Sequence, residues 1–454
     1  MRVLADVRPF TGIRYDSARV GRLDTVLCEP YDVISPSAQR TYLDADPRNY
    51  IRVELGEDET GDTPSRNRYT RARAALEQWL ASAEMVIDPS PAFYVLSESY
   101  TLAGQSRTRI GLFAAVGLRD WSERVILPHE HTMPKPKADR LSLMQACEAN
   151  TSPILTTYSD PQGELRAILE EAITTASPVA EATKLPAMLS AADDHRLWRI
   201  DEPTAIERIS TFFRGRVLYI ADGHHRYETA LGYWRSRQAA GAEDDDPASC
   251  VLMLLVDVDD PGLAVFPTHR LLRTVARVDE YALCASLGHW IEVTTLPAAV
   301  EVDTALAELA AVRGRHAFTV LTSDATYILR SREGADLRSA MPEGHSDAWY
   351  GLDVSVLHEV VLPRAFLLPD DAASLGEIAF TRDAAEAAEA VSSGRYAAAV
   401  LMRPTQVGQV TEIALAGDVM PQKSTYFWPK PLSGLVIYPH RGLAETAQRI
   451  RRSC

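Results

Sequence analysis

The chain has 454 residues, of which 46% are hydrophobic, and its 47 Lys and Arg against 62 Asp and Glu give a net charge of −15. At roughly 150 residues per domain, this is the composition of a soluble globular protein with two or three domains. The acidic balance argues against a protein that coats duplex nucleic acid or an anionic membrane, because both are bound through a basic surface. We therefore expect neither a nucleic-acid partner nor a membrane partner.

We expect no segment for membrane insertion or secretion. No run of about 18 consecutive apolar residues occurs. Asp6 and Arg8 stand where a signal peptide has its apolar region. The sequence thus predicts a cytoplasmic protein.

Helix-like and strand-like segments alternate over the first part of the chain. Apolar side chains recur at helical spacing over residues 69–85, and two strand-like runs flank Gly104 within residues 92–118, which is typical of a hairpin. Residues 121–140 are charged and rich in proline, and they precede a helical run at 141–150. Further strands are expected at 152–160 and 195–200, and further helices at 163–176 and 202–213.

The strongest signal for chemistry is the segment ADGHHRYETA, residues 221–230. It follows an apolar, β-branched run and places a glycine turn before a helix that begins at His224 or His225, a geometry suited to phosphate. Gly223 lets the backbone approach a ligand closely, and Arg226 adds side-chain donors. Asp222 can hold a divalent metal ion or accept a hydroxyl proton. The alternative is an ordinary Asp-Gly turn whose histidines cap neighbouring groups.

A second candidate segment is PHEHTMPKPKADR, residues 128–140. Alternate side chains of an extended chain point apart, so of the first three polar residues only His129 and His131 could share a face, too few ligands for zinc. The basic residues fit better as clamps for phosphate or carboxylate groups, oriented by acidic neighbours. The clamps are Lys135, Lys137 and Arg140, and the acidic neighbours are Glu130 and Asp139. A solvated charged loop is the alternative interpretation.

Two shorter segments also carry candidates. In CEPYDVIS, Pro30 fixes the backbone beside Glu29, which could present a carboxylate base, although an ordinary turn explains the pattern equally well. In KSTYFWPK, donors at residues 423–425 stand beside Lys430, and the aromatic residues are interpreted as packing. The patterns GxxxxGK[ST] and GxGxxG and the protein-kinase signature are absent, so a nucleotide would bind through a different loop.

The composition changes from about Val275 onward. Ala-rich helical patterns at 303–314 and 383–394 alternate with strand patterns at 316–323, 326–331 and 396–402. This alternation predicts a second α/β domain. We place the domain boundaries at 1–272 and 273–454.

Several motifs in fixed order carry a resemblance to a known family. They are RPFTGIRYD, EPYDVI, NYIRVELG, PHEHT, KPKADRL, EANTSPI, DHRLW, ADGHHRYETA, FPTHRL and MPQKSTYFWPK. Through them the chain resembles, over nearly its whole length, the prokaryotic family labelled domain of unknown function 1015. More distantly, the strand–DGHHR–helix unit is similar to the GxxR-type box of the ParB and sulfiredoxin superfamily, in which that box holds nucleotide phosphates.

The distant resemblance implies a fold and an activity. The fold is mixed α/β, with a ParB/sulfiredoxin-like nucleotide-binding core that contains a large insertion and with a C-terminal α/β domain. The superfamily includes nucleotide hydrolases and kinases that convert free serine to O-phosphoserine. We expect a kinase that uses Mg²⁺ and either ATP or ADP to phosphorylate a small hydroxyl compound, best of all free L-serine. The alternatives are a nucleoside-triphosphate hydrolase and a non-catalytic nucleotide-binding regulatory protein.

The expected site residues fall into three groups. Asp222, Glu29 and His225 are the expected catalytic residues, with Asp222 also the metal ligand. Nucleotide and phosphate groups are assigned to Gly223, His224, His225, Arg226 and Thr229. Substrate binding is assigned to His129, Glu130, Thr132, Lys135, Lys137, Asp139, Arg140 and Asn150.

Overall fold

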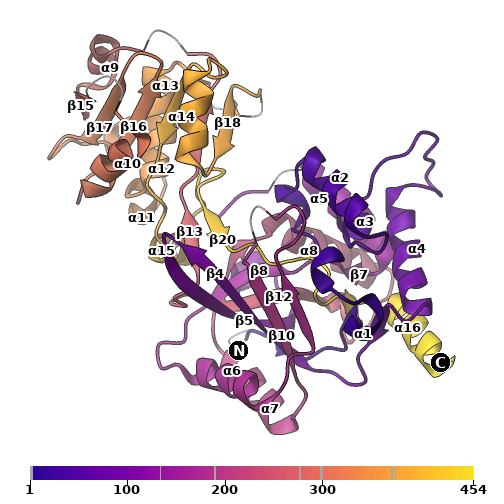
Figure 1. Cartoon of the computed structure of the whole chain (residues 1–454). Coiled ribbons are helices and arrows are strands. Elements are labelled where there is room, and N and C mark those ends of the chain that lie inside the picture. The colour runs from indigo at the N-terminus through magenta and orange to yellow at the C-terminus, as the bar shows by residue number, and fades with distance from the viewer. Residues whose placement is uncertain are drawn as a thin grey trace. The chain divides into compact units, whose positions relative to one another are not determined.

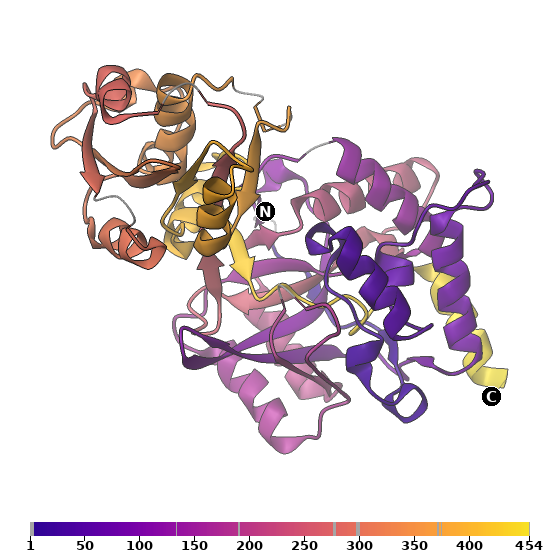
Figure 2. The ribbon, with the colours of Figure 1, turned by 45° about the horizontal axis from the view of Figure 1, so that its top comes forward.

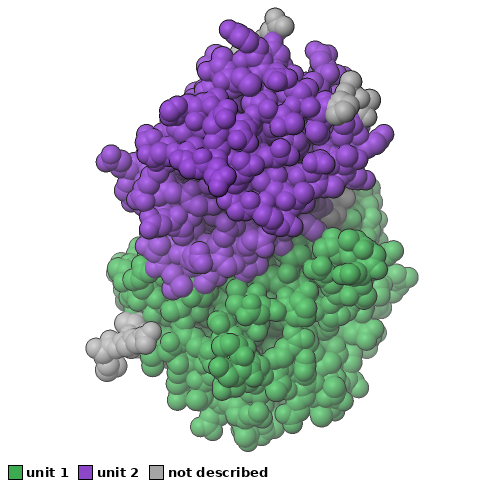
Figure 3. Space-filling view, turned by 90° about the vertical axis from the view of Figure 1, so that its left-hand side faces the viewer, with its two compact units in different colours: residues 1–128, 132–264, 428–454 green, residues 129–131, 265–427 purple. Residues whose placement is uncertain are grey.

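The computed structural model describes residues 4–132, 134–188, 191–275, 278–296, 300–369, 372–373 and 375–453. Contacts divide the chain into two compact units (Figure 3). The first unit comprises residues 1–128, 132–264 and 428–454, and the second comprises residues 129–131 and 265–427. The units are defined by contacts alone, so the domains 1–272 and 273–454 stay a prediction. The C-terminal segment from Trp428 onward belongs with the first unit.

The first unit is built on a nine-stranded mixed sheet with the order β6-β11-β8-β12-β5-β4-β10-β9, and β1 pairs with β5. Its strands are β1 (Val7–Arg8), β4 (Phe93–Leu102), β5 (Gln105–Gly117), β6 (Ile126–Leu127), β8 (Ile154–Tyr158), β9 (Ala180–Thr183), β10 (Asp194–Ile200), β11 (Leu218–Asp222) and β12 (Cys250–Asp257). Small two-stranded pairs are β2 (Ile13–Tyr15) with β3 (Met85–Ile87) and β7 (Ala149–Asn150) with β21 (Tyr438–Pro439). Strand β12 is apolar and buried almost throughout, as expected for a central strand covered on both faces.

The helices of the first unit include α1 (Ser17–Val20), α2 (Pro36–Ala45), α3 (Ile51–Glu54), α4 (Arg68–Ala81), α5 (Pro134–Cys147), α6 (Glu164–Thr175), α7 (Pro203–Phe213), α8 (His224–Ala239) and α16 (Arg441–Ser453). Helices α6 and α7 pack side by side (Figures 1 and 2), and together with α8 they contribute apolar side chains to one core cluster of the sheet. The hairpin β4–β5 confirms the pattern around Gly104.

Helix α5 begins earlier than the sequence indicated. We expected a polar segment up to residue 140 and a helix from 141, but the helix starts at Pro134. Proline is compatible with the first turn of a helix, because the backbone N–H that it lacks has no intrahelical partner there. The basic residues that follow Pro134 are therefore carried on a helix.

The second unit contains a six-stranded sheet with the order β15-β17-β16-β19-β14-β18. Its strands are β14 (His269–Leu272), β15 (Ile291–Leu296), β16 (Ala317–Thr322), β17 (Thr326–Ser331), β18 (Ile378–Thr381) and β19 (Ala398–Leu401). Its helices include α9 (Glu280–Leu287), α10 (Val302–Ala311), α11 (Asp347–Tyr350), α12 (Asp353–Val356), α13 (Leu362–Ala365), α14 (Ala384–Ser392) and α15 (Val407–Ala416). The chain passes between the units at β13 (Ala264–Phe266) and β20 (Tyr426–Trp428).

The mixed α/β class is confirmed in both units. The Ala-rich patterns form α10 and α14, which pack against the sheet of the second unit, α14 through its alanines and α10 through Leu306 and Leu309. Among the helices of the described ranges, none combines the length and the apolar character that a membrane crossing requires.

Candidate functional site

The turn between β11 and α8 forms as the sequence predicted. Gly223 has φ of 98°, a left-handed conformation that glycine adopts without strain, and α8 begins at His224. A Cβ atom on Gly223 would lie 2.9 Å from Nε of Arg226, so the guanidinium of Arg226 covers this turn closely. The glycine is therefore required both for the backbone conformation and for the position of the arginine.

Two cations hold the carboxylate of Asp222 at the end of β11. Nη2 of Arg226 donates to Oδ2 of Asp222 at 2.7 Å, and Nζ of Lys430 donates to Oδ1. Arg226 and Lys430 are only 6% and 4% exposed. Burial by itself would raise the pKa of Asp222, but the charges of Lys430 and Arg226 outweigh it and hold the pKa well below its ordinary value. Asp222 is therefore ionised at neutral pH.

The guanidinium of Arg226 has one N–H group without a hydrogen-bond acceptor among the described residues. Nη1 donates to the carbonyl of Pro153, and Nη2 donates to Asp222. Nε is buried and has no hydrogen-bond partner among the described residues. A buried donor without a partner is costly, and such groups are concentrated at functional sites. The guanidinium places buried positive charge at the N-terminus of α8, where the helix dipole also favours an anion.

The segment CEPYDVIS, which contains Tyr31 and Asp32, and Glu54 of NYIRVELG lie near this turn. The charges of Asp32 and Glu54 act on Arg226, and the charges of Arg226 and Asp222 act in turn on Tyr31. Burial, reinforced by Asp32, raises the pKa of the Tyr31 hydroxyl to about 12. The structure thus brings together two motifs that are far apart in the sequence.

Glu54 was not among the expected site residues. Its Oε1 accepts a hydrogen bond from the backbone N–H of Tyr31 at 3.2 Å and lies 3.6 Å from Nη1 of Arg140. Oε2 of this fully buried carboxylate has no hydrogen-bond partner among the described residues. The available signal was its place in the motif NYIRVELG, next to other family motifs. A buried carboxylate oxygen that lacks a hydrogen-bond donor can accept a proton or a hydrogen bond from a polar ligand.

Arg140 and Asp139 lie in the same neighbourhood but are already engaged. The guanidinium of Arg140 lies 4.0 Å from the centre of the Tyr31 ring, and its Nε donates to Asp139 at 2.7 Å. Asp139 also accepts hydrogen bonds from Arg68 at 2.7 Å and from the Tyr69 hydroxyl at 2.9 Å. The hydrogen bonds of Asp139 with Arg68 and Tyr69 therefore link α5 to α4.

Helix α5 packs on α8 and brings a lysine to the candidate site. Nζ of Lys137 donates to Glu228 at 2.8 Å, and the Thr132 hydroxyl donates to the same carboxylate at 2.6 Å. The Thr229 hydroxyl donates to the Lys137 carbonyl at 3.4 Å. The side chain of Lys135 lies outside the described part of the structure.

The two histidines of the turn differ in their surroundings. His224 is buried, and its charge acts on Asp222. His225 is partly exposed, and its charge acts on Glu228. His224 thus lies near Asp222, and His225 lies near Glu228, which pairs with Lys137 of α5.

Four other expected residues have partners away from the Asp222 cluster. Asn150 is buried, and its Oδ1 accepts the backbone N–H of Leu252 at 2.9 Å. Glu29 is fully buried, and the Tyr42 hydroxyl donates to it at 3.5 Å. His129 and Glu130 belong to the second unit, where they contact Thr425 at 3.1 Å and the backbone N–H of Lys423 at 3.0 Å.

A resident metal centre built from protein side chains is not seen in the described ranges. No group of three or more His, Cys, Asp or Glu residues there is arranged to hold a metal ion. A metal ion that arrives with nucleotide phosphates needs fewer protein ligands, commonly one or two carboxylates.

The family resemblance is confirmed. The chain belongs to the family described as "Protein of unknown function (DUF1015)", whose model matches residues 7–355. A comparison with curated proteins gave no match.

Comparison with solved structures gave distant similarities. A free serine kinase in complex with AMP shares 15% identity at a TM-score of 0.37, and the alignment covers 74% of this chain and 93% of that one. A conserved hypothetical protein from Pyrococcus furiosus shares 15% identity at 0.34, over 74% and 97%. SbnI with a C-terminal truncation, from Staphylococcus aureus, shares 14% identity at 0.34, over 75% and 93%.

Proposed function

We propose that this protein is a nucleotide-dependent kinase that phosphorylates the hydroxyl group of a small metabolite, with free L-serine as the first substrate to test. The observation that carries the proposal is the cluster at the N-terminus of α8. There Arg226 and Lys430 are buried around Asp222, and Nε of Arg226 has no hydrogen-bond partner among the described residues. Phosphoryl transfer requires chiefly positioning and neutralisation of charge, and buried cations beside a helix N-terminus supply both.

Asp222 acts in this proposal as an anchor for cations. A general base works best with a pKa near the operating pH, whereas the neighbouring cations hold the pKa of Asp222 far below that range. Its carboxylate orients Arg226 and Lys430, and its remaining lone pairs can bind the Mg²⁺ that accompanies a nucleotide. Mg²⁺ would supply charge neutralisation on the phosphate oxygens.

The base that takes the hydroxyl proton is then sought among the buried carboxylates. Glu29 stays the predicted base. Glu54 is a second candidate base, because its Oε2 has no hydrogen-bond partner among the described residues. Both lie near Cys28, since their charges contribute, after burial, to raising the pKa of its thiol. A buried carboxylate close to the substrate hydroxyl would accept its proton as the oxygen–phosphorus bond forms.

Lys137 is the better clamp for the carboxylate of an amino-acid substrate. Its side chain is 35% exposed, and its pair with Glu228 is partly solvated, so a substrate carboxylate can replace that contact at small cost. Arg140 is 6% exposed and is fixed by Asp139 and the Tyr31 ring. We therefore assign substrate binding to Lys137 before Arg140.

Phosphorus NMR tests the reaction. Purified protein with Mg²⁺ and either ATP or ADP would be incubated with L-serine, other hydroxyl amino acids and small alcohols. A phosphomonoester formed with one acceptor supports the kinase. Free phosphate without an ester indicates the hydrolase, and an unchanged nucleotide indicates the non-catalytic binding protein.

Calorimetry tests the site independently of the reaction. A charge-assisted hydrogen bond from a desolvated guanidinium contributes about 1.5–3 kcal/mol, so Arg226→Ala should weaken nucleotide binding by roughly 10- to 150-fold. Arg235→Ala is the matched control, because Arg235 lies on the same helix with its side chain 58% exposed and pairs with Asp120. Wild-type affinity in Arg226→Ala would contradict the proposed site.

A further inference from the structure

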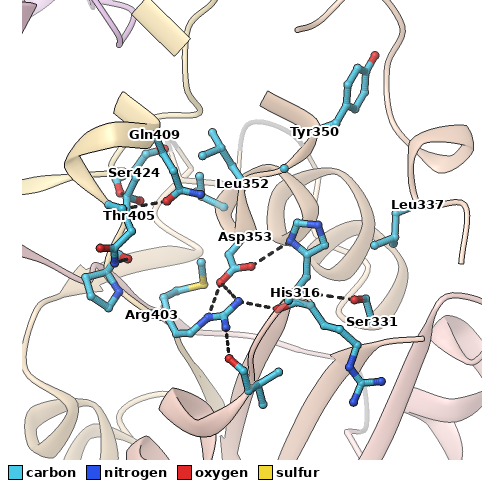
Figure 4. A pocket seen from close by; sticks show the side chains of 18 of the residues that line it. His316, Ser331, Leu337, Tyr350, Leu352, Asp353, Arg403, Thr405, Gln409 and Ser424 are labelled. Atoms are coloured by element: carbon cyan, nitrogen blue, oxygen red, sulfur yellow. Dashed lines mark hydrogen bonds and ion pairs between the residues drawn. The ribbon is translucent and has the colours of Figure 1, made fainter. Parts of the chain in front are cut away.

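The second unit contains a large cavity that the proposed kinase site does not use. It has a volume of about 820 Å³, and all of its lining residues belong to the second unit (Figure 4). Pockets for small organic ligands have volumes of about 300–1,000 Å³. Five arginines line it against two aspartates, in a chain whose net charge is −15. The arginines are Arg270, Arg313, Arg315, Arg338 and Arg403.

One of these arginines is buried without an acidic partner. Arg270 is 1% exposed, and its guanidinium donates to the carbonyls of Thr268 and Lys423. Among the described residues its Nε has no hydrogen-bond partner, and burial is the sole cause that shifts its pKa, with no contribution from an acidic group. Burial lowers the pKa of Arg270 to about 10, which still leaves the group charged at neutral pH. A buried charge that lacks a counter-charge is costly, so an anion in this cavity would stabilise the unit.

Asp353, one of the two aspartates that line the cavity, is already engaged. Oδ2 of Asp353 accepts from Nε of Arg403 at 2.8 Å, and Oδ1 lies 3.0 Å from Nδ1 of His316 (Figure 4). Arg403 also donates to the carbonyls of Val312 and Arg315, both at 2.8 Å. Asp353 therefore neutralises Arg403 and fixes the imidazole ring, and it is not a partner of Arg270.

Two further arginines have partners that a ligand can replace. Arg315 lies 3.2 Å from Glu292, and their side chains are 32% and 42% exposed. Arg338 lies 2.7 Å from Asp347, and these side chains are 59% and 90% exposed. Exposed ion pairs of this kind contribute little to stability, so both guanidinium groups can turn to an anion at low cost.

We infer that this cavity is a second ligand site, which binds a small organic molecule with phosphate or carboxylate groups and uses Arg270 as the buried counter-charge. Guanidinium groups recognise both oxyanions through paired N–H donors. The volume exceeds what a single inorganic ion needs and leaves room for an organic portion beside Tyr350 and Leu352. Such a site would let the second unit sense a metabolite independently of the nucleotide.

Calorimetry on the full-length chain tests the inference with two probes, inorganic pyrophosphate and citrate, which separate phosphate from carboxylate recognition. Arg270→Gln should weaken binding of the preferred probe by about tenfold or more, because it removes a buried charge-assisted donor. Arg315→Gln should weaken it as well and leaves the core intact, so it decides the question if Arg270→Gln does not fold. Arg395→Gln is the control, since Arg395 lies outside the cavity with its side chain 53% exposed.

Hydrogen–deuterium exchange locates the bound probe. Protection of residues 312–316 and 402–406, retained in Arg226→Ala, would support a site in the second unit that is distinct from the proposed nucleotide site. The inference is overturned if neither probe binds at millimolar concentration, or if affinity is unchanged in both Arg270→Gln and Arg315→Gln. Protection confined to residues 221–230 would overturn it too, and would leave the proposed kinase site standing.

Discussion

The substitution Asp222→Asn examines the buried cluster most directly. It keeps the shape of the side chain but removes the negative charge that faces Arg226 and Lys430, whose side chains are 7% and 5% exposed. At about 4 Å and an effective dielectric constant of about 20, one such charge pair is worth roughly 4 kcal/mol before hydration is regained. Breaking a buried pair by removing one partner costs about 3–5 kcal/mol in practice. We expect the free energy of unfolding to fall by that amount.

Urea denaturation of wild type and variant at neutral pH measures this loss, and a second substitution tests its origin. Lys430→Met alone leaves the Asp222–Arg226 pair intact and should cost less than Asp222→Asn. In the double variant that combines Asp222→Asn with Lys430→Met, the two losses in unfolding free energy should not be additive, and the coupling energy should be about 0.5–3 kcal/mol. Glu59→Gln is the control, because Glu59 is 50% exposed in the same unit and should change stability little.

The pH dependence separates electrostatics from packing. The folded-state pKa of Asp222 lies below its ordinary value of 3.8, so its stabilisation is fully present above pH 3.8 and is lost as the pH falls through the lower folded value. The difference between wild type and Asp222→Asn should therefore be fully present at neutral pH and shrink below about pH 4. A loss under about 1 kcal/mol at neutral pH, or a difference that does not shrink below about pH 4, would refute the reasoning.

Two further substitutions examine what positions this cluster. Gly223→Ala should lower the free energy of unfolding by about 1–2 kcal/mol, because the residue has φ of 98° and a Cβ would displace the Arg226 guanidinium. The affinity for nucleotide should fall as well. An unchanged affinity by calorimetry would contradict the proposed position of Arg226. Arg109→Met should lower the free energy of unfolding by about 3–5 kcal/mol in urea denaturation, because it removes the cation that pairs with the fully buried Glu98. It also removes the donor to the Pro429 carbonyl, which accepts from Arg109 at 2.7 Å and precedes Lys430. Adding Glu98→Gln should recover part of the loss, and no recovery would argue against an electrostatic cause.

Local patterns in the sequence predicted the strand–turn–helix unit correctly. An apolar run, an Asp-Gly pair and a polar helix start are adjacent in the chain, so short-range sterics and hydrogen bonding determine the geometry at Gly223. The Ala-rich helices of the second unit were predictable for the same reason, because their periodicity is local. The start of helix α5 was predicted too late because the segment before residue 141 is charged and rich in proline, although proline fits the first turn of a helix.

The partners of this unit could not be predicted in the same way. Lys430 reaches Asp222 across 208 positions, and Tyr31 and Glu54 come from a third part of the chain. Such contacts depend on how the sheet of the first unit is assembled, and no spacing between these residues encodes them. The segment at 128–140 illustrates the same limit, since His129 contacts Thr425 in the second unit while Lys137 contacts α8.

The two candidate ligand sites share one physical property. Five arginines of the described residues have a buried Nε without a hydrogen-bond partner. Arg119, Arg199 and Arg237 have side chains that are 32%, 12% and 37% exposed, so solvent reaches these side chains more readily than those of the other two. Arg226 and Arg270 are only 6% and 1% exposed. The cost of an open donor rises as water is excluded, and a bound anion removes that cost. The positions where an anion gains most are therefore the N-terminus of α8 and the cavity of the second unit.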